Sequence, residues 1–470
     1  MHSFGRSRAA RDRALRTARH SAALTCATVG LIASTPSPAA AAGTIHTPYS
    51  DAVAYDADLT TTGDGTTFTG TETITVKNAG TGPIARVWLR LWANGAVGCG
   101  DRAVKITAIG GGTAGRTERD CTALEILLPG ALAPRAQTKL TLTLSITAPE
   151  IQDRFGIAEG MRLFGNALPV LAQRDVTGWR LPSYSAFGES FVSSWARFSL
   201  TLHHPTAVKI AASGATATTS DPGGATSTTT SVIDARDTFW AAGTNMIEET
   251  GTTRRGTLIR AWAPREAGGD RADALGQAID AMEQLERRLP DYPYSEYDVV
   301  VARIDAGGGM EYPGAVITDA SSEVTRHETA HQWFYGLVGN DQFREPWVDE
   351  GITSFLEFSW TTASDLPRPT CYPSSRFTIR DPTTFITESM AYWNKHTGQY
   401  GLVYDNPVCA MREVRDAMGA AKFKRTMNVI VKKYARGFVS GANLRREFNR
   451  AGGRKVERLW AKWGLAPGRR

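Results

Sequence analysis

The sequence predicts an α+β, multidomain protein in which an N-terminal antiparallel β sandwich or saddle domain precedes a mainly helical domain. Its 470 residues exceed what a single compact core usually holds. Apolar and polar residues alternate between about residues 49 and 249, which indicates strands, and apolar residues recur at helical spacing past Arg255. We therefore expect a β domain over residues 43–252 and a second domain over residues 253–470.

The first 42 residues have the pattern of a secretory signal peptide. Six arginines precede a mostly apolar run from Ala22 to Ala33, and the small residues Ala39 to Ala42 follow. This order is typical of export signals, and the apolar run is too short to span a membrane. A disordered basic tail would explain the arginines but not the apolar run. We therefore expect a secreted, extracellular protein.

The charge of the chain changes when this segment is removed. Residues 1–42 carry six arginines and one aspartate, so the formal net charge falls from +6 to +1. A nearly neutral chain gives no indication of a nucleic-acid partner.

Four cysteines remain after residue 42, and an even number in an exported protein suggests two disulfides. Proximity in the sequence favours the pairs Cys99 with Cys121 and Cys371 with Cys409. The sequence contains no C-x-x-C pair, so a zinc site made of cysteines is not expected.

Alternating segments of the N-terminal half predict a half-buried antiparallel sheet. They are Thr73–Val76, Val87–Leu91, Leu140–Leu144 and Phe198–Leu202. The Ser/Thr/Gly-rich segment Ser213–Ser231 is expected to be a loop or a weak hairpin inside this domain.

The second domain begins with a predicted helix whose apolar residues run from Ala274 to Leu289 and end at Pro290. Tyr297–Val301 then predicts a buried strand, and a glycine-rich turn follows it. Further helices are predicted over Val408–Met418 and Phe423–Ala435.

The segment Arg326–Trp333 contains the pattern H-E-x-x-H, formed by His327, Glu328 and His331. Residues four apart share one face of a helix, so both imidazoles can face one metal ion. A catalytic zinc takes three protein ligands and leaves a fourth position open. Glu350, followed by a predicted helix over Ile352–Phe358, supplies the third candidate. We therefore predict one zinc ion per chain.

This ligand set predicts a hydrolytic role for Glu328. Zinc lowers the pKa of a water from about 15.7 toward about 7 and polarises a carbonyl. Glu328 would accept the proton of the water and pass it to the departing amine. A closed structural zinc site is the alternative, but it requires a fourth protein ligand and gives Glu328 no role.

With these residues in place, the chain resembles the aminopeptidase N family of gluzincin zinc metallopeptidases, in its short two-domain bacterial form. The blocks that carry the resemblance are His327–Phe334, Gly339–Asp341, Trp347–Gly351, Gly308–Pro313, Asp175–Trp179 and Gly188–Phe191. The resemblance implies a saddle-shaped β domain packed on a thermolysin-like catalytic domain, with the active site between them.

The resemblance also assigns substrate-binding roles. Gly308, Gly309, Met310 and Glu311 match the exopeptidase motif G-x-M-E-N, whose glutamate binds the free α-ammonium of the substrate. Tyr312 stands where the motif has asparagine. Without the resemblance, the glycines would be read as a tight turn and Glu311 as a solvated carboxylate.

The family also uses a tyrosine hydroxyl to stabilise the oxyanion of the transition state. Tyr404 lies in the best match to the usual V-Y-x-K-G setting, although Asn406 and Pro407 depart from it. Tyr400 is the competing candidate, and a core aromatic is the alternative for both.

The sequence thus predicts a secreted zinc aminopeptidase that acts on peptides with a free N-terminus and has no membrane span. A zinc endopeptidase, or a hydrolase of non-peptide substrates, would not use Glu311 as an amine anchor. A secreted zinc-binding protein without catalysis is a third possibility, which retention of His327, His331, Glu328 and Glu350 disfavours.

Overall fold

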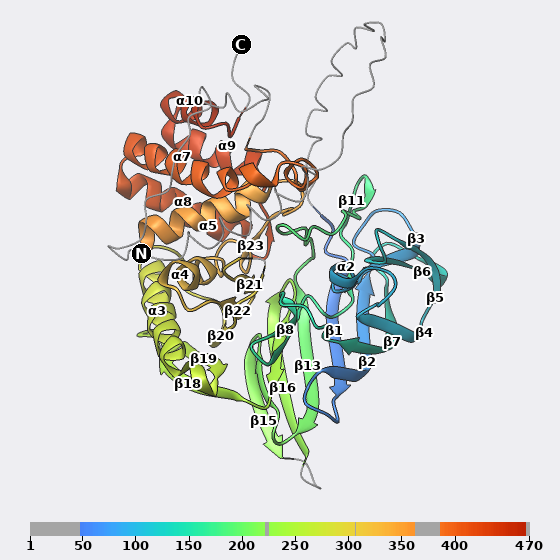
Figure 1. The fold of residues 1–470 in the computed structure, drawn as a ribbon. Coiled ribbons are helices and arrows are strands. Elements are labelled where there is room, and N and C mark those ends of the chain that lie inside the picture. The colour runs from blue at the N-terminus through green and yellow to red at the C-terminus, as the bar shows by residue number, and fades with distance from the viewer. Residues whose placement is uncertain (1–47, 221–224, 306, 362–385, 467–470) are drawn as a thin grey trace, which may run out of the picture. The chain divides into compact units, whose positions relative to one another are not determined.

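The computed structural model describes residues 48–220, 225–305, 307–361 and 386–466 (Figure 1). These residues belong to one compact unit that spans residues 45–470. The predicted signal peptide lies outside the described residues. Among the described residues, no helix is both long enough and apolar enough to cross a membrane.

The N-terminal half is built on a seven-stranded sheet in the order β15-β16-β13-β1-β2-β7-β4. Only the β1–β13 pairing is parallel, and the other neighbours are antiparallel. The strands are β1 (Ala52–Thr60), β2 (Thr67–Lys77), β4 (Val104–Gly110), β7 (Gln137–Thr147), β13 (Ala196–Pro205), β15 (Ala215–Ser220) and β16 (Ala225–Ala235). The Ser/Thr-rich segment therefore contributes the paired antiparallel strands β15 and β16.

Two four-stranded sheets complete the β domain, in the orders β10-β3-β6-β5 and β14-β17-β9-β8. The first contains β3 (Ile84–Arg90), β5 (Thr113–Glu118), β6 (Ala123–Leu132) and β10 (Val170–Leu171). The second contains β8 (Phe155–Ala158), β9 (Met161–Gly165), β14 (Lys209–Ala212) and β17 (Phe239–Gly243). The short elements are α2 (Asn94–Val97), β11 (Arg174–Asp175) and β12 (Gly178–Trp179).

Inward-facing residues of these sheets form one core, with Phe164 stacked on Trp240 at 4.7 Å between ring centroids. Cys99 and Cys121 form a disulfide, as predicted. Cys371, the predicted partner of Cys409, lies outside the described residues. The predicted antiparallel β domain is confirmed.

A five-stranded sheet opens the second half, in the order β18-β19-β20-β22-β21. It consists of β18 (Met246–Thr252), β19 (Leu258–Pro264), β20 (Glu296–Val301), β21 (Met310–Tyr312) and β22 (Ala315–Thr318). Both edge strands, β18 and β21, run antiparallel to their neighbours. Helix α3 (Gly268–Glu286), with η1 (Arg265–Ala267) before it, shares a core with β19 and β20.

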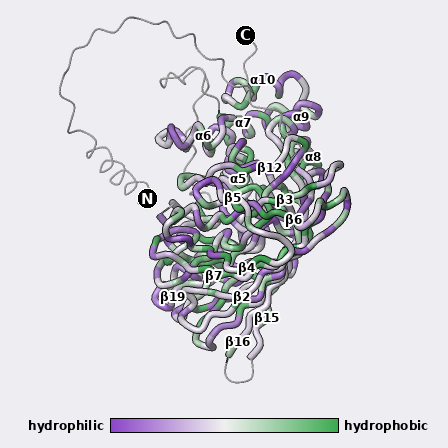
Figure 2. Tube along the Cα trace, turned by 90° about the vertical axis from the view of Figure 1, so that its right-hand side faces the viewer, coloured by the Kyte–Doolittle hydropathy of each residue, from purple (hydrophilic) through white to green (hydrophobic). Residues whose placement is uncertain are grey.

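Helices make up most of the rest of the chain. They are α4 (Ser322–Ala330), α5 (Pro346–Trp360), α6 (Met390–Trp393), η3 (Thr397–Gln399), α7 (Leu402–Met418), α8 (Ala420–Tyr434), α9 (Gly441–Gly452) and α10 (Arg454–Lys462). Strands β23 (Val338–Gly339) and β24 (Gly437–Phe438) form a parallel pair. Hydrophilic and hydrophobic residues alternate along α9 and α10 (Figure 2), as expected for helices that bury one face. The mainly helical second half is confirmed.

Helix α7 begins six residues before the predicted start at Val408, and Pro407 lies inside it. A proline lacks the N–H that would bond the carbonyl four residues earlier, which is why sequence reading favours a helix that starts after it. At this proline, α7 packs against α5. A Cβ atom at Gly351 would lie 2.3 Å from Cγ of Pro407, so the glycine allows the two helices to approach closely.

Candidate metal centre

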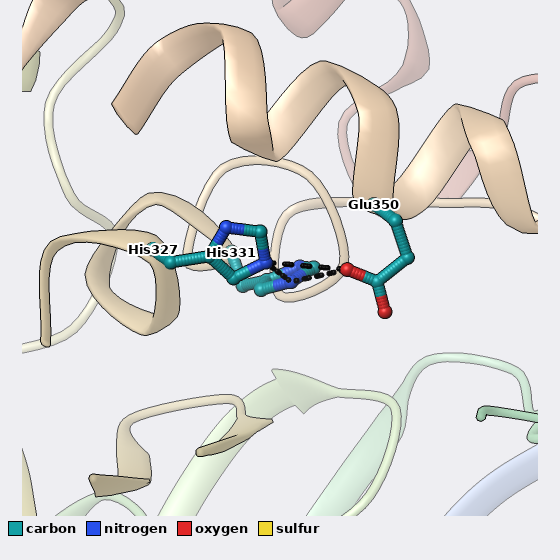
Figure 3. Close-up of side chains that lie close together, drawn as sticks. All are labelled: His327, His331 and Glu350. Atoms are coloured by element: carbon teal, nitrogen blue, oxygen red, sulfur yellow. Dashed lines mark hydrogen bonds and ion pairs between the residues drawn. The ribbon is translucent and has the colours of Figure 1, made fainter. Parts of the chain in front are cut away.

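The predicted ligands lie on two neighbouring helices. His327 is in α4, His331 is the C-cap residue one turn later, and Glu350 is in α5. Ser321 caps α4, because its hydroxyl accepts a hydrogen bond from the Val324 N–H at 3.3 Å. Figure 3 shows the two imidazoles meeting the Glu350 carboxylate at one point.

The distances between the ligand atoms fit one zinc ion. Nε2 of His327 lies 3.2 Å from Oε2 of Glu350, and Nε2 of His331 lies 3.4 Å from the same oxygen. The two Nε2 atoms are 3.1 Å apart. Tetrahedral bonds of about 2.0–2.1 Å place ligand atoms about 3.3 Å apart. Two imidazoles and one carboxylate are the donor set of catalytic zinc, with a fourth position left for water or substrate.

Both histidines are oriented through their second ring nitrogen. Nδ1 of His327 lies 2.9 Å from Oε2 of Glu357, and Nδ1 of His331 donates to the Phe334 carbonyl at 3.0 Å. Asp349 also faces Nδ1 of His331, at 3.3 Å. A proton on Nδ1 leaves Nε2 free as a ligand, so these contacts select the tautomer that binds metal.

Glu328 is buried beside the ligands, and its Oε2 has no hydrogen-bond partner within the described residues. Burial raises the pKa of Glu328 to about 7, although the neighbouring histidines oppose this rise. Its side chain lies against Gly309, where a Cβ atom would come 2.6 Å from Cγ of Glu328. The buried position and raised pKa suit a general base that works near neutral pH.

Glu311 lies on edge strand β21 and is 3% exposed. Burial, together with the charges of Asp349, Glu350 and Glu328, raises its pKa to about 8, while His331 opposes the rise. Its Oε1 accepts a hydrogen bond from Nε2 of Gln342 at 3.1 Å.

The rest of the predicted substrate motif surrounds this strand. Gly308 has φ of +107°, a conformation that favours glycine. Met310 is buried, and its sulfur accepts a hydrogen bond from Nη1 of Arg154 at 3.2 Å. Tyr312 stacks on Phe239 with ring centroids 4.9 Å apart. Since adjacent strand residues face opposite sides, Tyr312 packs into the core while Glu311 faces the metal ligands.

Both candidate tyrosines lie beside the ligand set. The ring centroid of Tyr404, in α7, is 5.9 Å from that of His327. Tyr400 lies 5.6 Å from Tyr404, again between ring centroids. Burial and the charge of nearby carboxylates, including Glu350, raise the pKa of both hydroxyls well above the ordinary value. The role of Tyr404 as oxyanion stabiliser stays a prediction.

Sequence reasoning gave no role to Glu189, which lies in the loop that precedes β13. This residue is 5% exposed, and Nη1 of Arg154 lies 3.6 Å from its Oε1. Burial and the charges of Glu350 and Glu311 raise its pKa well above the ordinary value. A second carboxylate thus reaches the site from the β domain. In the sequence, Glu189 is marked only by the family-like block Gly188–Phe191, which does not indicate that its carboxylate lies near the metal ligands.

Glu357, which contacts His327, was also not predicted, although its spacing from Glu350 in the sequence indicates its position. It lies seven residues after Glu350, so both occupy the same face of α5. Its carboxylate could therefore have been expected near the metal ligands.

Comparison with known proteins agrees with this geometry. Residues 273–463 match the Peptidase family M1 domain. Aminopeptidase M1-B of Oryza sativa subsp. japonica is 22% identical over 242 residues, which cover 45% of this chain and 27% of the relative. Aminopeptidase N of Streptomyces lividans is 22% identical over 199 residues, which cover 36% of this chain and 23% of that relative. The chain thus spans about a quarter of the length of these relatives.

Solved structures show the same two-domain fold. An M1 zinc metallopeptidase from Deinococcus radiodurans has a TM-score of 0.62 and 19% sequence identity, covering 89% of this chain and 94% of that chain. A two-domain M1 zinc metallopeptidase bound to L-arginine gives the same TM-score and coverage.

The site and fold therefore define a zinc metallopeptidase domain of the M1 class. Residues 273–463 carry this Peptidase family M1 domain, and the resemblance to the aminopeptidase N family is confirmed over that range.

Proposed function

We propose that this protein is a secreted zinc aminopeptidase that removes N-terminal residues from peptides. The observation that carries the proposal is the burial of Glu311 beside the metal ligands, together with Glu189, a second buried carboxylate that interacts electrostatically with Glu311 and Glu350. Buried carboxylates that close to one another repel, and a cation relieves this repulsion. The free α-ammonium of a peptide is such a cation, whereas an internal peptide bond carries none.

Each of the site residues has its own role in this reaction. Glu311 and Glu189 bind the ammonium and so place the first peptide bond at the ligand set. Glu328 accepts a proton from the attacking water and passes it to the departing amine. The hydroxyl of Tyr404 donates a hydrogen bond to the oxygen of the scissile carbonyl as charge develops there. His327, His331 and Glu350 would hold a zinc ion, which would supply Lewis acidity and lower the pKa of the water.

Ligands of the structural neighbours support the choice of substrate. Neighbouring M1 metallopeptidases are described bound to L-arginine, to L-tryptophan and to a Tyr-Ser-Ala substrate. All three ligands carry a free α-amino group. They support a site that recognises an N-terminal ammonium in the present chain.

Secretion is proposed from the sequence of the first 42 residues, with the basic, apolar and small-residue order typical of export signals. The disulfide between Cys99 and Cys121 supports this proposal, because such bonds persist in oxidising compartments. The test expresses the full chain in cells, separates the medium from the cells, and determines the N-terminal sequence of the protein in each fraction. An intact N-terminus on protein that stays inside the cells would contradict export.

The activity is tested with pairs of aminoacyl anilides, one free and one N-acetylated. Acetylation removes the cation but leaves the scissile bond and side chain unchanged. We expect hydrolysis of the free compound only. Equal hydrolysis of both members of a pair would refute amine recognition and favour an endopeptidase.

A further inference from the structure

Gln342 lies between the carboxylate proposed to bind the substrate amine and a carboxylate that faces a metal ligand. Its side chain is fully buried, in the loop between β23 and α5. Its Nε2 donates to Oε1 of Glu311 at 3.1 Å and to Oδ2 of Asp349 at 2.5 Å. Both amide hydrogens are therefore used. Because both partners are carboxylates, the nitrogen and not the oxygen of the amide must face them.

Asp349 extends this contact to the metal site. Its Oδ1 lies 3.3 Å from Nδ1 of His331, and the next residue along α5 is the ligand Glu350. Hydrogen bonds thus join Glu311, Gln342 and Asp349, and Asp349 faces the ring of His331 at ion-pair distance, while the Nδ1–H of His331 donates to the Phe334 carbonyl. Each of these residues is at most 3% exposed, so water does not compete for these contacts.

An amide suits this position for a physical reason. Two buried carboxylates repel each other, and an amide can donate to both without adding a charge. Its planar NH₂ group also fixes the angle between the two acceptors. A glutamate of the same shape would have no N–H to donate, and an apolar side chain would leave both carboxylates without this partner.

We propose that Gln342 is a positioning residue that holds the amine anchor Glu311 and the metal ligand His331 in fixed relation to each other. The part that concerns Glu311 rests on the proposed function. The effect of Gln342 on His331 is indirect, through Asp349, and this half of the proposal rests on the metal site alone. Loss of the amide should therefore weaken both substrate binding and metal binding.

The test uses Gln342→Leu and the nearly isosteric Gln342→Glu, with Gln173→Leu as the matched control. Gln173 is 2% exposed, and its Nε2 donates to Oγ of Ser194 at 2.7 Å instead of to a carboxylate. As in Gln342, its Oε1 has no hydrogen-bond partner within the described residues. The control therefore reports the cost of losing a buried glutamine whose amide nitrogen bonds a hydroxyl and not a carboxylate.

Three quantities are measured for each variant: the zinc dissociation constant by chelator competition, KM and kcat on an aminoacyl anilide, and the thermal midpoint of unfolding. We expect both Gln342 variants to bind zinc about 10–100-fold more weakly, as for losses of groups that orient metal ligands. KM should rise about tenfold, equivalent to about 1.4 kcal/mol. Gln173→Leu should lower the thermal midpoint only.

A double-mutant cycle with Glu311→Gln separates the two effects. In that background, Gln342→Leu should no longer raise KM, while its effect on zinc binding should persist. Unchanged zinc affinity and KM in both Gln342 variants, with only a stability loss like that of the control, would overturn the proposal. If the wild-type protein hydrolyses no aminoacyl anilide, the proposed function fails, and the zinc measurements still decide whether Gln342 acts on the metal site.

Discussion

Oε2 of Glu357 lies 2.9 Å from Nδ1 of His327, on the side of the ring opposite the ligand atom Nε2. A carboxylate in this place holds the ring by a charge-assisted hydrogen bond and makes Nε2 a better donor to the metal. The pair explains why Glu357 is almost fully buried although it is neither a ligand nor a base.

Replacing Glu357 by alanine should weaken zinc binding about 10–100-fold, because the His327 ring loses its orienting partner. Glu357→Gln, which keeps an acceptor but removes the charge, should have a smaller effect. Chelator competition measures both. Glu345→Gln is a suitable control, because this partly buried glutamate accepts from the Gly441 N–H at 2.9 Å instead of from a ligand. Wild-type zinc affinity in Glu357→Ala would contradict the orienting role.

Glu328→Gln should retain stoichiometric zinc and lose activity, since Glu328 is adjacent to the ligands but is not one of them. Loss of a general base lowers kcat by about 10²–10⁴-fold. Elemental analysis and steady-state kinetics on an aminoacyl anilide measure the two quantities separately. Turnover close to that of the wild type would remove Glu328 from the reaction.

The two tyrosines can be separated by their phenylalanine variants. Tyr404→Phe should reduce kcat by about 10²–10³-fold, as expected for loss of a donor to the developing oxyanion, without changing zinc content. Tyr400→Phe should have a smaller effect on kcat. The opposite ranking would move the oxyanion role to Tyr400.

Glu72 should destabilise the folded protein at neutral pH. It is fully buried in β2, and neither carboxylate oxygen has a hydrogen-bond partner within the described residues. Burial raises its pKa well above the ordinary value, so the folded state binds the proton more tightly than the unfolded state does. The contribution of this group to stability is therefore largest below about pH 4 and declines as the pH rises.

Glu72→Met replaces the carboxyl by an apolar group of similar size. At neutral pH, we expect the free energy of unfolding to increase by about 1–3 kcal/mol, because an unpartnered polar group is removed from the core. The gain should shrink toward pH 4. Chemical denaturation at several pH values measures it, and a variant less stable than the wild type at every pH would show that Glu72 has a stabilising partner.

The strands and the ligand set could be predicted because they depend on local pattern. Alternation in segments such as Leu140–Leu144 reports strands that bury one face, and β7 alternates in this way. The spacing of His327 and His331 fixes their common helix face, and the segment that contains Glu350 carries its own helical pattern.

The remaining contacts depend on tertiary packing, which local pattern does not contain. Glu189 reaches the site from the β domain, and Gln342 reaches it from a loop. Alternation in Thr73–Val76 correctly predicts that Ile74 and Val76 are buried. Glu72 lies on the same buried face, although alternating strands usually bury apolar residues there. The early start of α7 places Pro407 against Gly351, a residue of another helix.

The central claim is that the protein removes residues from a free N-terminus, and it is tested most directly by the products formed from a peptide of about ten residues. Mass spectrometry over time should show a ladder of fragments, each shortened from the N-terminus, and the N-acetylated peptide should stay intact. Internal fragments, or cleavage of the acetylated peptide at a similar rate, would contradict the account.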